Sequence, residues 1–174
     1  YGDTTVSETE DAGFGAYAAG TAGWDEIAHA APYYLIVKSA GNDRNDAGPE
    51  PGGEHYYWNP GAGEWAQSTA ERDPDGGTDG YDSVGYRGCA KNILTVGAVE
   101  DIPGGWTDPA DVVMSGFSNW GPTDDGRVKP DLVANGVGLY SAYVDSNDSY
   151  RQLSGTSMSA PNASGSLNLL AQHY

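Results

Sequence analysis

Residues 155–161 read Gly-Thr-Ser-Met-Ser-Ala-Pro, a pattern typical of a tight bend followed by the first turn of a helix. Glycine permits the bend, and Pro161 fits early in a helix, where a backbone N–H has no partner in any case. Apolar residues then recur at helical spacing, at Ala163, Leu167 and Leu170. The sequence therefore predicts a helix over residues 157–171.

Ser157 stands at the start of this predicted helix, in the positive end of the helix dipole and beside unpaired backbone N–H groups. Those N–H groups can hold an oxyanion next to the hydroxyl that creates it, which makes Ser157 a candidate nucleophile. Serine is also a favoured helix N-cap, so its position leaves a simple capping role open as the alternative.

The length and the composition exclude several classes of protein. The chain has 174 residues, enough for one domain with a sizeable core, and a net charge of −17 with only 8 Lys and Arg residues. A phosphate backbone or an anionic lipid surface would be repelled by this charge, so we expect neither nucleic acid nor membrane as a partner. No stretch of ~18 apolar residues is present to span a bilayer. The acidic balance suits a secreted or salt-exposed surface.

Cys89 is the only cysteine, so an internal disulfide is impossible. It follows Gly88 and precedes an apolar run, which is typical of a small buried side chain. A cysteine protease would need a partnered histidine, and none is near in the sequence. We therefore expect Cys89 to be structural.

Short apolar runs alternate with helical periodicity along the chain. The Ala-rich segment predicts a helix over residues 15–31, closed by Pro32. The apolar runs, each the length of a buried strand, are residues 34–38, 93–98, 112–114 and 132–134. This alternation predicts an α/β fold in which helices cover a mostly parallel sheet on both faces, the sheet containing 34–38, 93–98 and 132–134.

Residues 43–83 interrupt this pattern with many Asp, Gly, Pro and aromatic residues, and we interpret them as an insertion. A hairpin is expected around residues 56–58 and Trp65. The acidic string at 73–80 suggests calcium, but Gly77 and Val84 occupy ligand positions of an EF-hand loop, which favours a solvated loop. We assign no metal site and no certain cofactor; calcium stays possible, and no His/Cys cluster supports zinc.

Asn42 ends the first apolar run, in Ser39-Ala40-Gly41-Asn42. The carboxyl end of a strand is where an α/β sheet presents its ligand-binding groups. The Asn42 amide can donate an N–H without adding charge, which suits an oxyanion hole. The alternative is a turn residue, since Asn after Gly commonly has that role.

Three stretches resemble landmarks of the subtilisin-like serine proteases, the subtilases. Residues 155–161 resemble the nucleophile motif Gly-Thr-Ser-Met-Ala/Ser-x-Pro, and residues 39–42 resemble the oxyanion-hole motif. Residues 117–122, followed by Lys-Pro-Asp at 129–131, resemble a third landmark. The family continues there with Ala-Pro-Gly, whereas this chain has Ala-Asn-Gly at 134–136. The resemblance implies a three-layer subtilisin-like fold, a mostly parallel sheet flanked by helices.

The resemblance also implies the roles of individual residues. Ser157 becomes the nucleophile, and the oxyanion donors are its own N–H and the Asn42 amide. Tyr1-Gly2 resembles the end of the family's Ser-x-Gly strand, one wall of the primary specificity pocket. The residues that contact substrate would be Tyr1, Gly2, Ala40, Gly41, Gly155 and Thr156. The substrate would be a peptide or protein, and the enzyme would be secreted or extracytoplasmic.

The family's Asp-Ser/Thr-Gly and His-Gly-Thr-His motifs, which carry the orienting acid and the base, do not occur in this chain. His29, His55 and His173 each lie in an unsuitable context. The resemblance therefore implies that residues 1–174 are the C-terminal part of one catalytic domain, with its N-terminal part as a necessary partner. We expect the chain by itself to be nearly inactive. Two alternatives remain open: a non-catalytic subtilase-like domain, and an acidic module whose Tyr and Trp side chains stack on carbohydrate.

Overall fold

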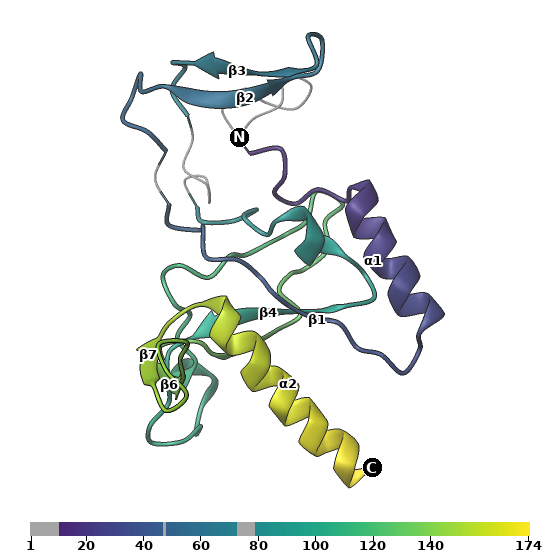
Figure 1. The fold of residues 1–174 in the computed structure, drawn as a ribbon, viewed down its shortest axis with the longest axis vertical. Coiled ribbons are helices and arrows are strands. Elements are labelled where there is room, and N and C mark those ends of the chain that lie inside the picture. The colour runs from purple at the N-terminus through teal and green to yellow at the C-terminus, as the bar shows by residue number, and fades with distance from the viewer. Residues whose placement is uncertain (1–10, 47, 73–78) are drawn as a thin grey trace.

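The chain is built on a parallel sheet of three short strands (Figure 1). The computed structural model describes residues 11–46, 48–72 and 79–174. Its strands are β1 (Val37–Ser39), β4 (Leu94–Val99) and β5 (Leu132–Asn135), in the order β1-β4-β5. Val37 pairs with Leu94, and Val96 pairs with Leu132. The expected parallel sheet is confirmed, although β1 begins later than residue 34.

Two helices flank this sheet on opposite sides in Figure 1, as expected for an α/β fold. α2 (Thr156–His173) packs against all three strands, whereas α1 (Ala19–Ala30) packs against the 3-10 helix η1 (Tyr86–Cys89). α1 begins four residues later than predicted because Phe14 forms an antiparallel bridge with Gly85, which keeps the preceding backbone extended. The Thr21 hydroxyl then accepts the Ala18 N–H and donates to the Tyr86 carbonyl, which anchors α1 to η1.

The core is made of small side chains gathered around β4, whose central residues are buried. Small residues are needed because neighbouring segments approach the β4 backbone closely. A Cβ atom built on Gly97 would lie 2.9 Å from the Pro130 ring and 3.1 Å from Ser118 Oγ. The buried apolar residues are Ala40, Val84, Cys89, Ala90, Ile93, Val96, Ala98, Val99 and Ala163.

Two antiparallel hairpins complete the described fold. The hairpin expected in the insertion is present as β2 (His55–Asn59) and β3 (Glu64–Ser68). The second hairpin, β6 (Leu139–Ala142) and β7 (Tyr150–Leu153), was not expected. Residues 112–114 form no strand, contrary to the expectation, because only Met114 pairs, in a single antiparallel bridge with Val99.

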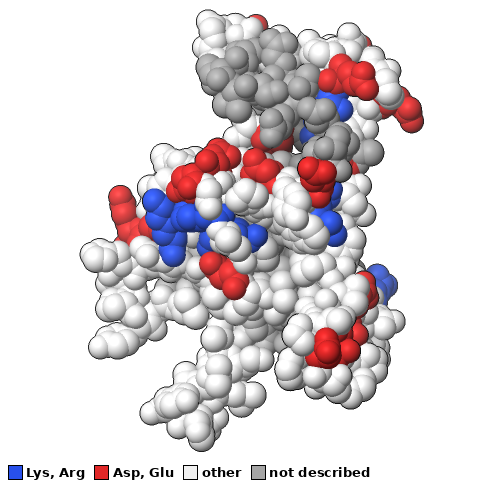
Figure 2. Space-filling view, turned by 180° about the vertical axis from the view of Figure 1, so that it is seen from behind, with Lys and Arg blue, Asp and Glu red and all other residues white. Residues whose placement is uncertain are grey.

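Charged side chains of both signs lie next to each other on the face shown in Figure 2. The Lys129 ammonium lies 2.7 Å from the Asp131 carboxylate, and the Arg127 guanidinium lies 2.8 Å from the Asp125 carboxylate. Lys129 and Arg127 are therefore each paired with an acid two residues away in the sequence. Within the described ranges, no helix is both long and apolar enough to cross a bilayer.

The Asp25 carboxylate ties α1 to the segment that leads into β4. It accepts hydrogen bonds from the backbone N–H groups of Lys91, at 2.8 Å, and Asn92, at 2.6 Å, and from the Tyr17 hydroxyl, at 2.7 Å. Burial raises the pKa of Asp25, but these hydrogen bonds outweigh it and hold the pKa below its ordinary value. The ionised carboxylate is thus favoured in the folded state.

Replacing Asp25 with asparagine is expected to lower the free energy of unfolding at pH 7 by about 1–3 kcal/mol, because an amide cannot accept all of these donors. A depressed folded pKa adds stability above the unfolded pKa, and this is lost as the pH falls through the folded pKa. The variant should therefore lose less stability than the parent below about pH 4. Urea unfolding at pH 7 and under acid checks both effects, with exposed Glu26→Gln as the control. Equal stabilities of parent and Asp25→Asn at pH 7 would contradict this role.

Candidate active site

Ser157 lies in the first turn of α2, where the chain leaves a buried bend. Gly155 forms the bend, and its N–H donates to the Gly136 carbonyl at 2.8 Å. Thr156 is buried, but Ser157 is exposed, so its hydroxyl is open to solvent. In the part of the chain that the structure describes, the N–H of Ser157 has no acceptor. The site thus combines an accessible hydroxyl with an unused backbone donor.

Asn42 reaches the same place from the carboxyl end of β1. Its side-chain oxygen Oδ1 accepts the Thr156 N–H at 2.8 Å and the Thr156 hydroxyl at 3.0 Å. The Thr156 hydroxyl in turn accepts the Gly41 N–H at 3.2 Å. Because a backbone N–H can only donate, the atom that faces Thr156 must be Oδ1. The Nδ2 group of Asn42 is therefore left to donate to another partner, beside the residue that precedes Ser157.

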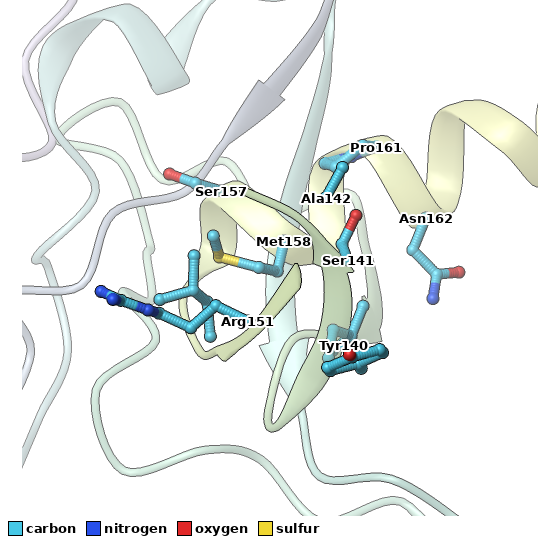
Figure 3. Close-up of a pocket in the computed structure, with 10 residues that line it drawn as sticks. Tyr140, Ser141, Ala142, Arg151, Ser157, Met158, Pro161 and Asn162 are labelled. Carbon is cyan, nitrogen blue, oxygen red and sulfur yellow. The ribbon is translucent and has the colours of Figure 1, made fainter. Parts of the chain in front are cut away.

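A hollow of about 410 Å³ lies directly beside Ser157, between the β6–β7 hairpin and the first two turns of α2 (Figure 3). In the close-up, Ser157 and Met158 occupy one part of its rim and Asn162 another, while Tyr140 and Arg151 project from the hairpin. Its lining residues are Leu139, Tyr140, Ser141, Ala142, Arg151, Leu153, Ser157, Met158, Pro161 and Asn162. Ser157 therefore stands at the border of this hollow.

A smaller hollow of about 220 Å³ lies next to Gly41, between the end of β1 and η1. It is lined by Lys38, Ala40, Gly41, Asp43, Gly85, Tyr86, Arg87, Gly88 and Asn119. The Lys38 ammonium donates to the Ser39 carbonyl at 2.7 Å. Burial lowers the pKa of Lys38, with a contribution from Arg87 that Asp43 opposes. Ala40 and Gly41 are thus among the residues that border a second hollow next to Asn42.

Six of the eight residues expected at the active site gather at this edge of the sheet. They are Ala40, Gly41, Asn42, Gly155, Thr156 and Ser157. Tyr1 and Gly2 lie outside the described residues, as does most of the acidic string at 73–80. Sequence reasoning missed the β6–β7 wall of the larger hollow and the buried Asn119 behind Gly41. The turn residues at 145–149 could have indicated the hairpin.

None of the three histidines is hydrogen-bonded to Ser157. His29 is exposed on α1, and His173 is exposed at the end of α2. His55 is buried in β2, where its Nδ1 lies 3.5 Å from the Gly53 carbonyl. Among the residues that the structure describes, no three His, Cys, Asp or Glu side chains are grouped as a metal site.

Cys89 is fully buried in η1, with its Sγ 3.4 Å from the Val84 carbonyl oxygen. Burial raises the pKa of this thiol to about 11. A thiol that stays protonated is a poor nucleophile, because the thiolate is the reactive form. Its structural role follows from its position in the core.

Parts of this chain are similar to known proteases. C5a peptidase of Streptococcus pyogenes is 48% identical over 61 residues, which cover 35% of this chain and 5% of that protein. Serine protease AprX of Bacillus subtilis is 34% identical over 110 residues, covering 55% of this chain and 24% of AprX. Pyrolysin of Pyrococcus furiosus is 35% identical over 109 residues, covering 52% of this chain and 8% of pyrolysin. The chain therefore spans less than a quarter of the length of each of these relatives.

Solved structures give a similar list of proteases. Sphericase aligns with a TM-score of 0.44 and 23% identity, over 75% of this chain and 31% of its own. The CspB protease of Clostridium perfringens aligns with a TM-score of 0.43 and 26% identity, over 62% of this chain and 22% of its own. A family model, described as the subtilase family, matches residues 2–174. Since this match includes nearly every residue, the chain belongs to the subtilase family.

Proposed function

We propose that this chain carries the nucleophile and the oxyanion hole of a serine endopeptidase, which hydrolyses peptide bonds through an acyl-enzyme. The observation that carries this proposal is the contact between Asn42 and Thr156. It directs the Asn42 Nδ2 group away from Thr156, at the start of a helix on which Ser157 is exposed and its N–H unused. Family membership and the similar proteases support a serine protease in general.

In the proposed reaction, Ser157 Oγ attacks the carbonyl carbon of the scissile peptide bond and loses its proton to a histidine. The carbonyl electron pair moves onto oxygen, and the Asn42 Nδ2–H and the Ser157 N–H donate to this oxyanion. Collapse expels the amine, which takes the proton from the histidine and leaves an ester on Ser157. Water then attacks this ester by the same route and releases the acid.

The hollows on either side of the nucleophile suggest how a peptide is held. Ala40 and Gly41 border the smaller hollow, which would accept a substrate side chain next to the scissile bond. Gly155 and Thr156 lie between Asn42 and Ser157, where the substrate backbone would pass. Tyr1 and Gly2 are proposed, from the family resemblance, to supply a further wall. The acidic composition fits a secreted or extracytoplasmic enzyme.

The base and its orienting acid would come from the N-terminal part of the same catalytic domain. Two features of this chain support such a partner. β1 is an edge strand, and no other strand among the described residues pairs with its outer side. Leu35, just before β1, is 51% exposed although it belongs to an apolar run. A further parallel strand at this edge would pair the free backbone groups and bury the apolar run.

A fluorophosphonate probe tests the proposal directly, because it reacts with activated serine hydroxyls. In the complete protein that contains this chain, the probe should label Ser157, as located by mass spectrometry of the peptide with residues 155–161. Unlabelled Ser157 in a folded complete protein would favour a non-catalytic subtilase-like domain. Binding of a glycan array by the folded protein, without labelling, would favour the carbohydrate-binding alternative.

The isolated chain is expected to hydrolyse peptides very poorly, because none of its three histidines is hydrogen-bonded to Ser157. Subtilisin, a member of the same family, retains roughly 10³–10⁴-fold acceleration over water when a triad member is missing. A residual acceleration of that order is the most we expect from the isolated chain. A chromogenic peptide assay on the purified chain, with Ser157→Ala as the control, measures it. Protease-level turnover that Ser157→Ala abolishes would show that the base lies within this chain.

A further inference from the structure

Asn119 is a buried side chain that touches the backbone on both sides of Asn42. It belongs to the segment 117–122, and only 1% of its surface is exposed. Its backbone N–H donates to the Gly41 carbonyl at 3.0 Å. Its side-chain Oδ1 accepts the Asp43 N–H at 2.6 Å, and its Nδ2 donates to the Asp43 carboxylate at 2.8 Å. The residues that flank Asn42 are thus both bonded to Asn119.

A third hydrogen bond of the Asn119 side chain fixes the orientation of its amide. Its Nδ2 also donates to the Ser83 carbonyl at 2.6 Å. The Asp43 N–H can only donate and the Ser83 carbonyl can only accept, so an inverted amide would lose both bonds. A buried polar group that loses its partners pays the cost of desolvation without compensation, so the observed orientation is favoured. Asn119 therefore connects the loop of Asn42 to a second, separate segment of the chain.

Gly41 shows how closely the two segments approach. Its φ angle is +118°, a value that favours glycine, and a Cβ atom at this position would collide with the Asn119 amide nitrogen. The Gly41 backbone consequently packs directly on the Asn119 side chain. Asn42 is then held from two sides: Asn119 restrains its backbone through Gly41 and Asp43, and Thr156 holds its side chain.

We infer that Asn119 is a positioning residue for the oxyanion hole, one that acts on the reaction through Asn42. This inference rests on the proposed function. Oxyanion donors are effective only when they lie about 2.7–3.1 Å from the oxygen on which charge develops. A loop that follows a strand end would otherwise move by more than this tolerance. Asn119 removes that freedom with three hydrogen bonds to the residues on either side of the donor.

Steady-state kinetics of the complete protease test the inference. The variants are Asn119→Ala, which removes the side-chain contacts, and Asn119→Asp, which keeps the size and the acceptor oxygen but loses both donor bonds. The matched control is Ser118→Ala. Ser118 is the neighbouring buried residue, and its hydroxyl accepts the Ala98 N–H on β4 at 2.9 Å instead of contacting the Asn42 loop. Each variant is also combined with Asn42→Ala, and thermal unfolding is measured for all.

Both Asn119 variants are expected to lower kcat by about 10-fold or more with little change in KM, since part of a donor worth about 10²–10³-fold is lost. Ser118→Ala should keep the parent kcat even if its melting temperature falls as far as that of the Asn119 variants. In the Asn42→Ala background, Asn119→Ala or Asn119→Asp should add no further loss, because the group on which Asn119 acts is gone. If Asn119→Ala does not fold, Asn119→Asp alone decides the test.

Three results would overturn the inference. They are an unchanged kcat in a folded Asn119→Asp variant, a loss equal to that of Ser118→Ala at equal stability, and a full further loss in the Asn42→Ala background. Each is informative only where Ser157→Ala abolishes activity in the same protein. If Ser157→Ala retains full activity, the proposed function fails before Asn119 is considered, so the two failures are distinguishable.

Discussion

Replacing Ser157 with alanine in the complete protease is expected to lower kcat by about 10⁶-fold, the size of loss that subtilisin, a protease of the same family, shows for its nucleophile. The physical reason is that alanine has no oxygen to form the acyl-enzyme. Ser157 is exposed, and its side chain has no hydrogen bond to any of the described residues, so its removal should leave the fold and the melting temperature unchanged. Initial rates with a chromogenic peptide and a thermal unfolding curve provide the two measurements.

The neighbouring serine provides the matched control for this experiment. Ser159 is buried, and its hydroxyl donates to the Thr156 carbonyl at 2.8 Å, one turn into the same helix. Ser159→Ala should cost stability but keep most of kcat, because its hydroxyl is buried and bonded to the helix backbone. The opposite pattern, with activity lost in Ser159→Ala and kept in Ser157→Ala, would rule out Ser157 as the nucleophile.

Replacing Asn42 with alanine in the complete protease is expected to lower kcat by about 10²–10³-fold with a small change in KM, a magnitude known from subtilisin itself for this kind of donor. The amide donates more strongly to the oxyanion than to the neutral carbonyl, so its loss falls on the transition state. Asn42 is exposed, and its replacement should leave the sheet intact. The measurement is the separation of kcat from KM by steady-state kinetics.

A second asparagine in the same loop controls for local disturbance. Asn45 is exposed three residues further on, and Asn45→Ala should leave both kcat and KM unchanged. Asn42→Asp adds a stricter condition, because its carboxylate still accepts from Thr156 but cannot donate to an oxyanion. We expect it to lose at least as much kcat as Asn42→Ala. A folded Asn42→Asp protein with the parent kcat would show that Asn42 is a turn residue without a catalytic role.

Local patterns in the sequence were enough to predict the main elements. Apolar runs of strand length mark β1, β4 and β5, and the recurrence of Ala163, Leu167 and Leu170 marks α2. These features depend on residues close together in the chain, so they can be read in order. The end of β1 and the start of α2 were likewise visible as short motifs. The family and the candidates Ser157 and Asn42 followed from those motifs.

Features that depend on contacts between distant segments could not be read in this way. The β6–β7 hairpin contains exposed polar residues and a long turn, and its apolar signal is weak. Residues 112–114 carry a stronger apolar signal, but only Met114 finds a partner. The position of Asn119 behind the Asn42 loop has no local pattern, because its partners are 36, 76 and 78 residues away, at Ser83, Asp43 and Gly41.

The sequence by itself determined the residue types of the site and the elements that carry them, since a strand, a helix start and a glycine bend are local properties of the chain. Only the tertiary structure decided that Asn42 turns its Oδ1 toward Thr156 and that Asn119 binds both of its neighbours. Those contacts follow from how the sheet and α2 pack together. Each hydrogen bond forms only after packing has brought residues far apart in sequence to within about 3 Å of each other.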